Sequence, residues 1–235
     1  MDVVDAPAKL TISLRITGTR ADGFHLLDAE MVSLDLVDTL TFEDGDGLAV
    51  SGNAASGVPS DDTNLVRRAL ALVGRRALVH VHKRIPAGSG LGGGSADAAA
   101  VLRWAGVEDP AIAVQLGADV PFCVRGGRAR VTGVGEIIEP LPPELRVFTL
   151  ALSPFACSTA LVYRKWDELG GPTGVGGNDL EPAALAVEPR LAAWRDRLGN
   201  ATGQQPHLAG SGSTWFVEGD HPGDGRIVVR TAGLR

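Results

Sequence analysis

The chain has 235 residues, a net charge of −6 and 44% hydrophobic residues. This composition indicates a globular protein with room for one large or two small domains, and its negative charge argues against a nucleic-acid partner. No apolar run approaches the ~18 residues of a membrane span, and the acidic start Met1-Asp2-Val3-Val4-Asp5 is unlike a signal peptide, so we expect a cytoplasmic protein with no membrane partner.

The first part of the chain is predicted to be rich in strands. Alternating patterns predict strands at 8–17, 29–36 and 39–43, with a turn at 20–23 joining the first two. Loops are expected at 44–47 and 51–60, and capping residues precede a predicted helix at 65–73. A strand at 77–82 then leads into a glycine-rich loop, and the alanine-rich helix after this loop ends by Gly106.

The glycine-rich loop is the most informative segment, and it reads Pro86-Ala87-Gly88-Ser89-Gly90-Leu91-Gly92-Gly93-Gly94-Ser95-Ala96. Glycines allow positive φ and close approach to a ligand, and the helix that follows directs unpaired N–H groups towards the loop. This combination predicts a phosphate-binding loop, whereas the simpler alternative is a flexible turn before a helix.

Two common types of phosphate loop do not fit this segment. Gly88, Gly90 and Gly93 match G-x-G-x-x-G, but a dinucleotide-binding fold needs that pattern directly after a buried parallel strand near the start of a βαβ unit. A Walker A loop ends in Gly-Lys-Ser/Thr, and no lysine stands between Lys83 and Lys165. Any catalytic lysine must therefore come from another part of the chain.

Two charged residues lie in otherwise apolar segments. Lys9 follows Ala-Pro-Ala at the start of the first strand, and Asp119 lies in the turn Leu-Gly-Ala-Asp-Val-Pro-Phe at 116–122. A surface position is the ordinary interpretation of a single lysine. Asp119 is either a helix cap or a functional group, and the sequence alone leaves both interpretations open.

The second part of the chain alternates helices and strands. Before it, a short helix is predicted near 110–116 and strands at 122–124 and 129–132; prolines at 140, 142 and 143 then separate the two parts. A strand at 146–152, a helix at 158–169, helices at 180–187 and 189–198, and strands at 207–208, 214–218 and 226–230 follow. Helices against mostly antiparallel strands predict an α+β fold.

Several segments, in this order, carry a resemblance to a known family: 6–9, 20–27, 86–96, 116–121, 133–136, 178–182 and 210–213. By these segments the chain resembles the GHMP kinase superfamily. Within it, the residues at 20–27 and 117–121 resemble the branch that phosphorylates cytidine diphosphate-linked methylerythritol in the non-mevalonate isoprenoid route. The resemblance implies an α+β, two-domain GHMP kinase fold: a ribosomal protein S5 domain 2-like domain at 1–143 and an α/β-sandwich domain at 144–235.

The resemblance also implies how the site works. ATP would be the phosphoryl donor, with Mg²⁺, and a small-molecule alcohol would be the acceptor. Asp119 would take the proton from the acceptor hydroxyl, and Lys9 would lie beside it and stabilise the developing charge. The loop at 86–96 would surround the β- and γ-phosphates with its N–H groups, and Ser95 would cap the helix or contact Mg²⁺.

For the acceptor, the resemblance assigns cytosine recognition to Phe24 and His25, with Tyr163 as a second aromatic face. The alternative interpretation makes Phe24 a core residue and His25 a turn residue. Two other functions stay open, a kinase for another small alcohol such as homoserine or a sugar, and a non-catalytic nucleotide-binding relative. The chain departs from the usual pattern of the family at Thr11, where asparagine is common, at Phe24, where tyrosine is common, and at Ser213, where proline is common.

The remaining polar groups have structural interpretations. Cys123 and Cys157 lie in apolar surroundings without metal-ligand spacing, which predicts buried free thiols. His80 and His82 share one face of a strand, and no third ligand is visible nearby, so we expect them on a solvated face. The segment 178–182, which contains Asp179, is expected to cap a helix and to contribute to packing between domains.

Overall fold

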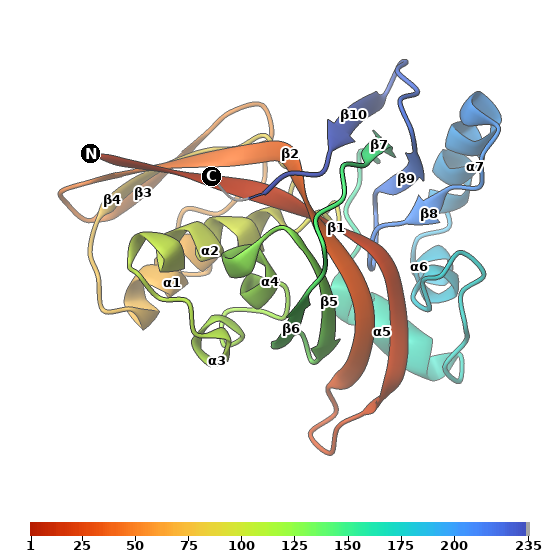
Figure 1. Ribbon diagram of the computed structural model, residues 1–235, viewed down its shortest axis with the longest axis horizontal. Helices are drawn as coiled ribbons and strands as arrows, with labels where there is room; N and C mark the ends of the chain where they lie inside the picture. The colour runs from red at the N-terminus through yellow and green to blue at the C-terminus, as the bar shows by residue number, and fades with distance from the viewer. Residues whose placement is uncertain (234–235) are drawn as a thin grey trace.

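The computed structural model describes residues 1–233 and contains two sheets with helices packed beside them (Figure 1). The strands are β1 (Asp2–Thr19), β2 (His25–Glu43), β3 (Gly47–Ser51), β4 (Leu78–His82), β5 (Arg128–Gly133), β6 (Ile137–Pro140), β7 (Val147–Ala151), β8 (His207–Leu208), β9 (Trp215–Glu218) and β10 (Arg226–Arg230). The helices are α1 (Leu65–Leu72), α2 (Gly93–Trp104), α3 (Pro110–Ala113), α4 (Val120–Arg125), α5 (Thr159–Glu168), α6 (Glu181–Val187) and α7 (Leu191–Thr202).

The first sheet is built around the long antiparallel hairpin of β1 and β2. Its order is β3-β4-β2-β5-β6, β1 pairs with β2, and only the β3–β4 pair is parallel. The second sheet is antiparallel, in the order β10-β7-β9-β8. Figure 1 shows α1 to α4 gathered on one side of the hairpin, and the second sheet with α6 and α7 on the other. These observations confirm the predicted α+β class.

Two hydrophobic clusters hold these layers together. The larger cluster packs the apolar faces of the helices on the sheets, and it includes the alanines of α2, which are small enough to let that helix lie close to its neighbours. The second cluster joins the two sheets and includes Leu10, Leu34, Phe148 and Phe216. It also contains Leu91, so the glycine-rich loop is anchored in the core by a fully buried side chain.

The strands divide along the chain at one place. All strands of the first sheet lie before Val147, and all strands of the second sheet begin there or later. This division supports the proposed domain boundary between 143 and 144. Contacts cross it, because the main-chain N–H of Ala232 donates to the carbonyl of Ser33 at 2.9 Å and Leu14 forms a bridge with Asn178.

Two sequence-based predictions of secondary structure are wrong. The strands predicted at 29–36 and 39–43 are one strand, β2, because the polar residue Asp38 between them is fully buried and is paired inside the protein. Residues 122–124, predicted as a strand, belong to α4. A short apolar run does not distinguish a buried strand from a buried helix, and Pro121 in the first turn favours the helix.

No helix within residues 1–233 is both long and apolar enough to cross a membrane. Cys123 and Cys157 are buried and free, as predicted. Burial raises the pKa of the Cys123 thiol to about 12, so this group is an unreactive part of the core.

Candidate active site

The glycine-rich loop lines a cavity of about 400 Å³ that lies between the two halves of the chain. The cavity is also lined by residues from β1, from the start of α4, from α5 and from the second glycine turn at 210–211. Of the predicted loop residues, Leu91 and Ala96 do not line it, because both side chains are buried in the core. The other members of the loop, from Pro86 to Ser95, do line it.

The glycines of the loop are required by close packing. Gly88, Gly90 and Gly92 have φ of +67°, +81° and +69°. A Cβ on Gly90 would lie 2.5 Å from the carbonyl oxygen of Ala209, and a Cβ on Gly92 would lie 2.8 Å from Cγ of Lys9. The loop therefore approaches both the second glycine turn and the Lys9 side chain more closely than any other residue type permits.

Hydrogen bonds hold the loop in this position. The Ser89 hydroxyl donates to the carbonyl of Pro86 at 2.7 Å, and the Ser89 carbonyl accepts from the N–H of Thr214 at 3.0 Å. The N–H of Lys9 donates to the carbonyl of Leu91 at 3.0 Å. The loop is thus attached to β1 on one side and to the second glycine turn on the other.

The start of α2 leaves donors free for an anion. Its N-cap is Gly92, which has no side chain to satisfy the amides of the first turn, and the first intrahelical bond runs from the N–H of Ala96 to the carbonyl of Gly92 at 2.8 Å. Ser95 lies inside the first turn and does not cap the helix, which corrects one of its two predicted roles. Its hydroxyl remains available at the cavity wall.

A buried ion network that was not predicted from the sequence connects the segments on either side of the glycine-rich loop. Lys83 donates to the carboxylates of Asp38 and Asp97, the second at 2.6 Å, and Asp38 also accepts from the N–H of Ile85 at 2.9 Å. All three side chains are buried. The network fixes where β4 ends and where α2 begins. A partial signal was present in the sequence, since Asp97 is an acid within the predicted alanine-rich helix, whereas Asp38 lies between two predicted strands.

Asp97 carries a strongly shifted pKa within this network. Burial raises the pKa of its carboxyl to about 7, the Lys83 ammonium opposes this shift, and the Asp38 carboxylate adds to it. Its Oδ1 atom has no hydrogen-bond partner within residues 1–233. A neutral carboxyl at this position therefore accounts for the unpaired oxygen better than a second buried charge does.

Lys9 and Asp119 meet at the wall of the cavity. Nζ of Lys9 lies 3.2 Å from Oδ2 of Asp119, the lysine side chain being buried and the aspartate 31% exposed. Lys9 also donates to the hydroxyl of Thr11 at 3.0 Å, so threonine serves as its acceptor at this position. Asp119 occupies the N-cap position of α4, but its side chain makes no capping hydrogen bond. Its carboxylate is thus free to face the cavity.

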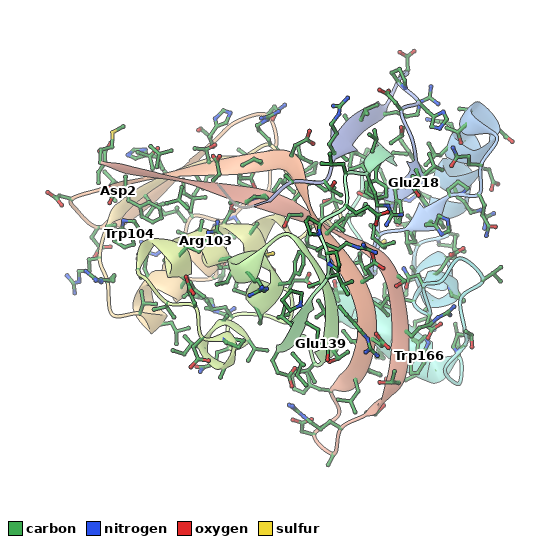
Figure 2. All side chains as sticks on the ribbon, viewed as in Figure 1. Asp2, Arg103, Trp104, Glu139, Trp166 and Glu218 are labelled. Carbon is green, nitrogen blue, oxygen red and sulfur yellow. The ribbon has the colours of Figure 1, made fainter. Side chains whose placement is uncertain are left out.

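A cluster of aromatic side chains adjoins the cavity at Tyr163. Tyr163 lines it, and its ring centroid lies 4.9 Å from that of His25. Nε2 of His25 lies 2.8 Å from a carboxylate oxygen of Asp167, and the ring of Trp166, labelled in Figure 2, meets His25 edge-on at 5.5 Å. Burial raises the pKa of the Tyr163 hydroxyl, which keeps it neutral.

Phe24 lies outside the cavity lining. Its side chain is at the turn of the β1–β2 hairpin, is 59% exposed and has the guanidinium of Arg20 5.5 Å from its ring centroid. It is therefore not a core residue, which removes the alternative interpretation of this position. The structure brings His25 and Tyr163 together and leaves Phe24 in solvent next to His25 in the chain.

The second glycine turn is held by Asn178. Its side-chain amide donates to the carbonyls of Gly210 at 2.6 Å and Leu208 at 2.9 Å, and its oxygen accepts from the N–H of Leu180 at the start of α6. Asp179, the next residue, accepts from Arg15 at 2.6 Å and from the N–H of Ile16, and it thereby links β1 to the second half. The segment 178–182 thus provides both a hydrogen bond at the start of α6 and a contact between the two halves, as predicted.

The predicted solvated histidines are exposed on β4. Within residues 1–233, no group of three or more His, Cys, Asp or Glu side chains is placed to hold a metal ion.

Comparison with known proteins agrees with this geometry. Residues 64–127, which include the loop and α2, match the GHMP kinases N terminal domain. A 4-diphosphocytidyl-2-C-methyl-D-erythritol kinase from Paracoccus denitrificans is 41% identical over 231 residues, covering 90% of this chain and 84% of the relative. The chain belongs to this kinase family. A second member, from Granulibacter bethesdensis, is 35% identical, and the match covers 97% of this chain and 89% of that relative.

Solved structures of this kinase family and of its superfamily share the fold. A crystal structure of 4-(cytidine 5'-diphospho)-2C-methyl-D-erythritol kinase is 29% identical, with a TM-score of 0.76, and the match covers 99% of this chain and 100% of that one. Homoserine kinase from Cytophaga hutchinsonii is 16% identical, with a TM-score of 0.61, over 100% of this chain and 96% of its own. At that identity the likeness shows the fold alone. As a member of a GHMP kinase family, the chain is an ATP-dependent kinase of a small-molecule substrate.

Proposed function

We propose that this chain transfers the γ-phosphoryl group of ATP to the 2-hydroxyl of 4-diphosphocytidyl-2-C-methyl-D-erythritol. The names of its relatives support this substrate, because they are kinases of that compound. The observation that carries the proposal is the pair of Lys9 and Asp119, 3.2 Å apart at the wall of a cavity formed by the glycine-rich loop.

The loop and the start of α2 would hold the triphosphate. The amides of the first turn of α2 lack a capping side chain, and the partial positive charge at a helix N-terminus favours an anion. The glycines allow the main chain to approach the phosphate oxygens without interference from a Cβ. This arrangement would place the γ-phosphate near Lys9, which packs against Gly92.

Asp119 would act as the general base. As the acceptor oxygen attacks the γ-phosphorus, the hydroxyl proton moves to the Asp119 carboxylate, and the bond between the γ-phosphorus and the bridging oxygen of ADP breaks. Lys9 would orient the carboxylate and stabilise negative charge on the transferred group. The Asp119 side chain is 31% exposed, whereas that of Lys9 is buried, so the acceptor could reach the Asp119 carboxylate.

Magnesium would accompany ATP. The Ser95 hydroxyl and the Asp119 carboxylate are among the hard oxygen donors that line the cavity, and they suit a cation that takes most of its ligands from phosphates and water. We assign the Ser95 hydroxyl as the protein contact of Mg²⁺. The bound ion would neutralise charge on the phosphates.

The cytosine of the acceptor would lie against the aromatic group. Tyr163 offers a ring face at the cavity, and the Asp167 contact to Nε2 leaves Nδ1 of His25 for the base edge. Phe24 would supply a second stacking face, because its exposed ring adjoins His25 in the chain and is free to cover a bound base. A phenyl ring stacks without the hydroxyl that tyrosine would add.

A coupled assay of ADP release tests this function. The chain is supplied with ATP, Mg²⁺ and, in separate reactions, 4-diphosphocytidyl-2-C-methyl-D-erythritol, homoserine or galactose. We expect turnover with the cytidine-linked acceptor and a new phosphate monoester at its 2-position by phosphorus NMR. Turnover only with homoserine or galactose would contradict the proposed acceptor. No turnover with any of the three compounds would favour a non-catalytic relative.

A further inference from the structure

A second and larger cavity lies away from the active site. It has a volume of about 560 Å³ and is bounded by α3, α4, β5 and β6, together with the segment after β6. It shares no lining residue with the active-site cavity. Its volume is within the roughly 300–1,000 Å³ that small-molecule sites occupy. Nothing in the proposed reaction uses it.

One part of this cavity is apolar. Pro121 and Val124 of α4 line it, and Ile138 of β6 and Leu141 just beyond the strand lie among its other lining residues. Pro121 and Val124 are buried, and Ile138 and Leu141 are half-buried. An apolar surface of this kind suits a short hydrocarbon body.

The lining of the same cavity is also positively charged. Its lining includes Arg103, Arg125 and Arg128, against a single acidic residue, Glu108. Arg128 is already neutralised by Glu30 at 2.8 Å and Glu144 at 2.9 Å. Within residues 1–233, neither of the other two arginines has a carboxylate within the 4.0 Å of an ion pair.

Arg103 is the more unusual of these two cations. It is half-buried, and within residues 1–233 its guanidinium donates to two main-chain carbonyls, those of Cys123 at 2.6 Å and Asp5 at 2.5 Å. Figure 2 shows it on α2, and α2 packs against α4. Its partial burial lowers the pKa of Arg103. A buried unpaired charge is costly, and an anion in the cavity would relieve that cost.

We propose that this cavity binds a small organic anion, an alkyl phosphate or diphosphate, with its charged head at Arg103 and Arg125 and its short apolar body against Ile138 and Leu141. Guanidinium groups suit such a head because they donate paired hydrogen bonds to phosphate oxygens. Arg125 is exposed at the end of α4 and is free to turn towards the ligand. The apolar wall then selects an alkylated anion over a bare one.

Isothermal titration calorimetry tests the proposal on the full chain. The active site is first saturated with Mg²⁺ and the β,γ-methylene analogue of ATP, so that a diphosphate cannot bind to the glycine-rich loop. The probes are 3-methylbutyl diphosphate, inorganic diphosphate and 3-methylbutan-1-ol. We expect the alkyl diphosphate to bind at one further site per chain, at least about threefold more tightly than diphosphate, and the alcohol not to bind measurably.

Two variants of the cavity lining and one control variant locate the site. Arg125→Glu is expected to raise the Kd for the alkyl diphosphate by about tenfold or more, because it removes one charge-assisted hydrogen bond. Arg75→Glu makes the same charge change at an exposed arginine outside the cavity and should leave the affinity unchanged. Leu141→Ser is expected to raise the Kd for the alkyl diphosphate but not the Kd for inorganic diphosphate. Far-UV circular dichroism checks that each variant is folded.

The results that overturn the proposal are distinct. Absence of binding when the active site is filled, or an Arg125→Glu variant that binds like the wild type, would refute the site. Equal affinities for the alkyl diphosphate and for diphosphate would refute the apolar part of the proposal. Because binding and not turnover is measured, the result does not depend on which alcohol the active site phosphorylates.

Discussion

The ammonium nitrogen of Lys9 lies 3.2 Å from a carboxylate oxygen of Asp119, and both groups line the cavity of the glycine-rich loop. Lys9 comes from β1 at the start of the chain, and Asp119 from the turn before α4. Within residues 1–233, neither group forms a second ion pair. This geometry supports our proposal that the pair removes a proton and stabilises charge when a phosphate is bound.

Replacement of the proposed base gives the first prediction. Asp119→Asn should lower kcat by about 10²–10⁴-fold, the usual contribution of a general base, because an amide cannot accept the proton. The Kd for ATP should change little, since the phosphate-binding amides remain. Steady-state kinetics and calorimetry measure the two effects, with Asp196→Asn, an exposed aspartate on α7, as the control. An Asp119→Asn enzyme with most of its activity would point to another base.

The packing of the loop gives the second prediction. Gly90→Ala should raise the Kd for ATP and lower the melting temperature, because its Cβ would collide with the carbonyl oxygen of Ala209 at 2.5 Å. Gly106→Ala is the matched control, since Gly106 also has positive φ, +74°, but has open space around it. It should cost only about 1–2 kcal/mol of conformational strain and leave ATP binding unchanged. Equal ATP affinities for both variants would contradict a structural requirement for glycine at position 90.

Acceptor binding gives the third prediction. Phe24→Ala should raise the KM for the cytidine-linked acceptor by the equivalent of about 1–3 kcal/mol, the usual contribution of stacking between a base and an aromatic side chain. The KM for ATP should stay the same. Phe24→Tyr keeps the ring and should retain the wild-type value or improve on it. If Phe24→Ala leaves the acceptor KM unchanged, the exposed ring has no part in binding and Tyr163 alone would offer the stacking face.

The pH dependence of stability gives the fourth prediction. The folded pKa of Asp97, about 7, lies above the ordinary value of an aspartate, near 3.9. Between these two values the folded state holds a proton that the unfolded state has lost. The stabilising contribution of this group is therefore complete below about pH 4 and is lost as the pH rises towards 7.

Asp97→Asn removes this titration. The stability of the variant relative to the wild type should therefore increase between pH 4.5 and pH 7.5, measured by urea unfolding at matched ionic strength. Asp196→Asn, which changes an exposed carboxylate, controls for general charge effects. A constant difference between the Asp97→Asn variant and the wild type across this range would show that Asp97 is ionised in the folded protein.

Parts of the fold and site that depend on local chemistry were predictable. The start of α1 after Asn64, the loop at 86–96 and the alanine-rich helix after it follow from capping residues, positive-φ glycines and helix propensity, which act over a few neighbours. The short segment at 122–124 was predicted wrongly, because its apolar residues fit a buried strand and a buried helix equally well.

Other parts depend on distant partners. The sequence presents Asp38 as a break in a strand, whereas in the structure β2 continues through it because its buried carboxylate is paired with Lys83 and with the N–H of Ile85. From the sequence Phe24 could have been a core residue, and only the structure shows it exposed next to the hairpin turn.

The amino-acid sequence by itself predicted a main-chain phosphate site at the start of a helix, because glycines and a first turn without a capping side chain favour an anion there. Only the tertiary structure decided what acts there. Pairing of β1 with β2, and packing of α2 against β1 and α4, bring an ammonium and a carboxylate from distant segments to that site. The physical reason is that side-chain contacts across sheets and helices depend on register and packing, which no local pattern encodes.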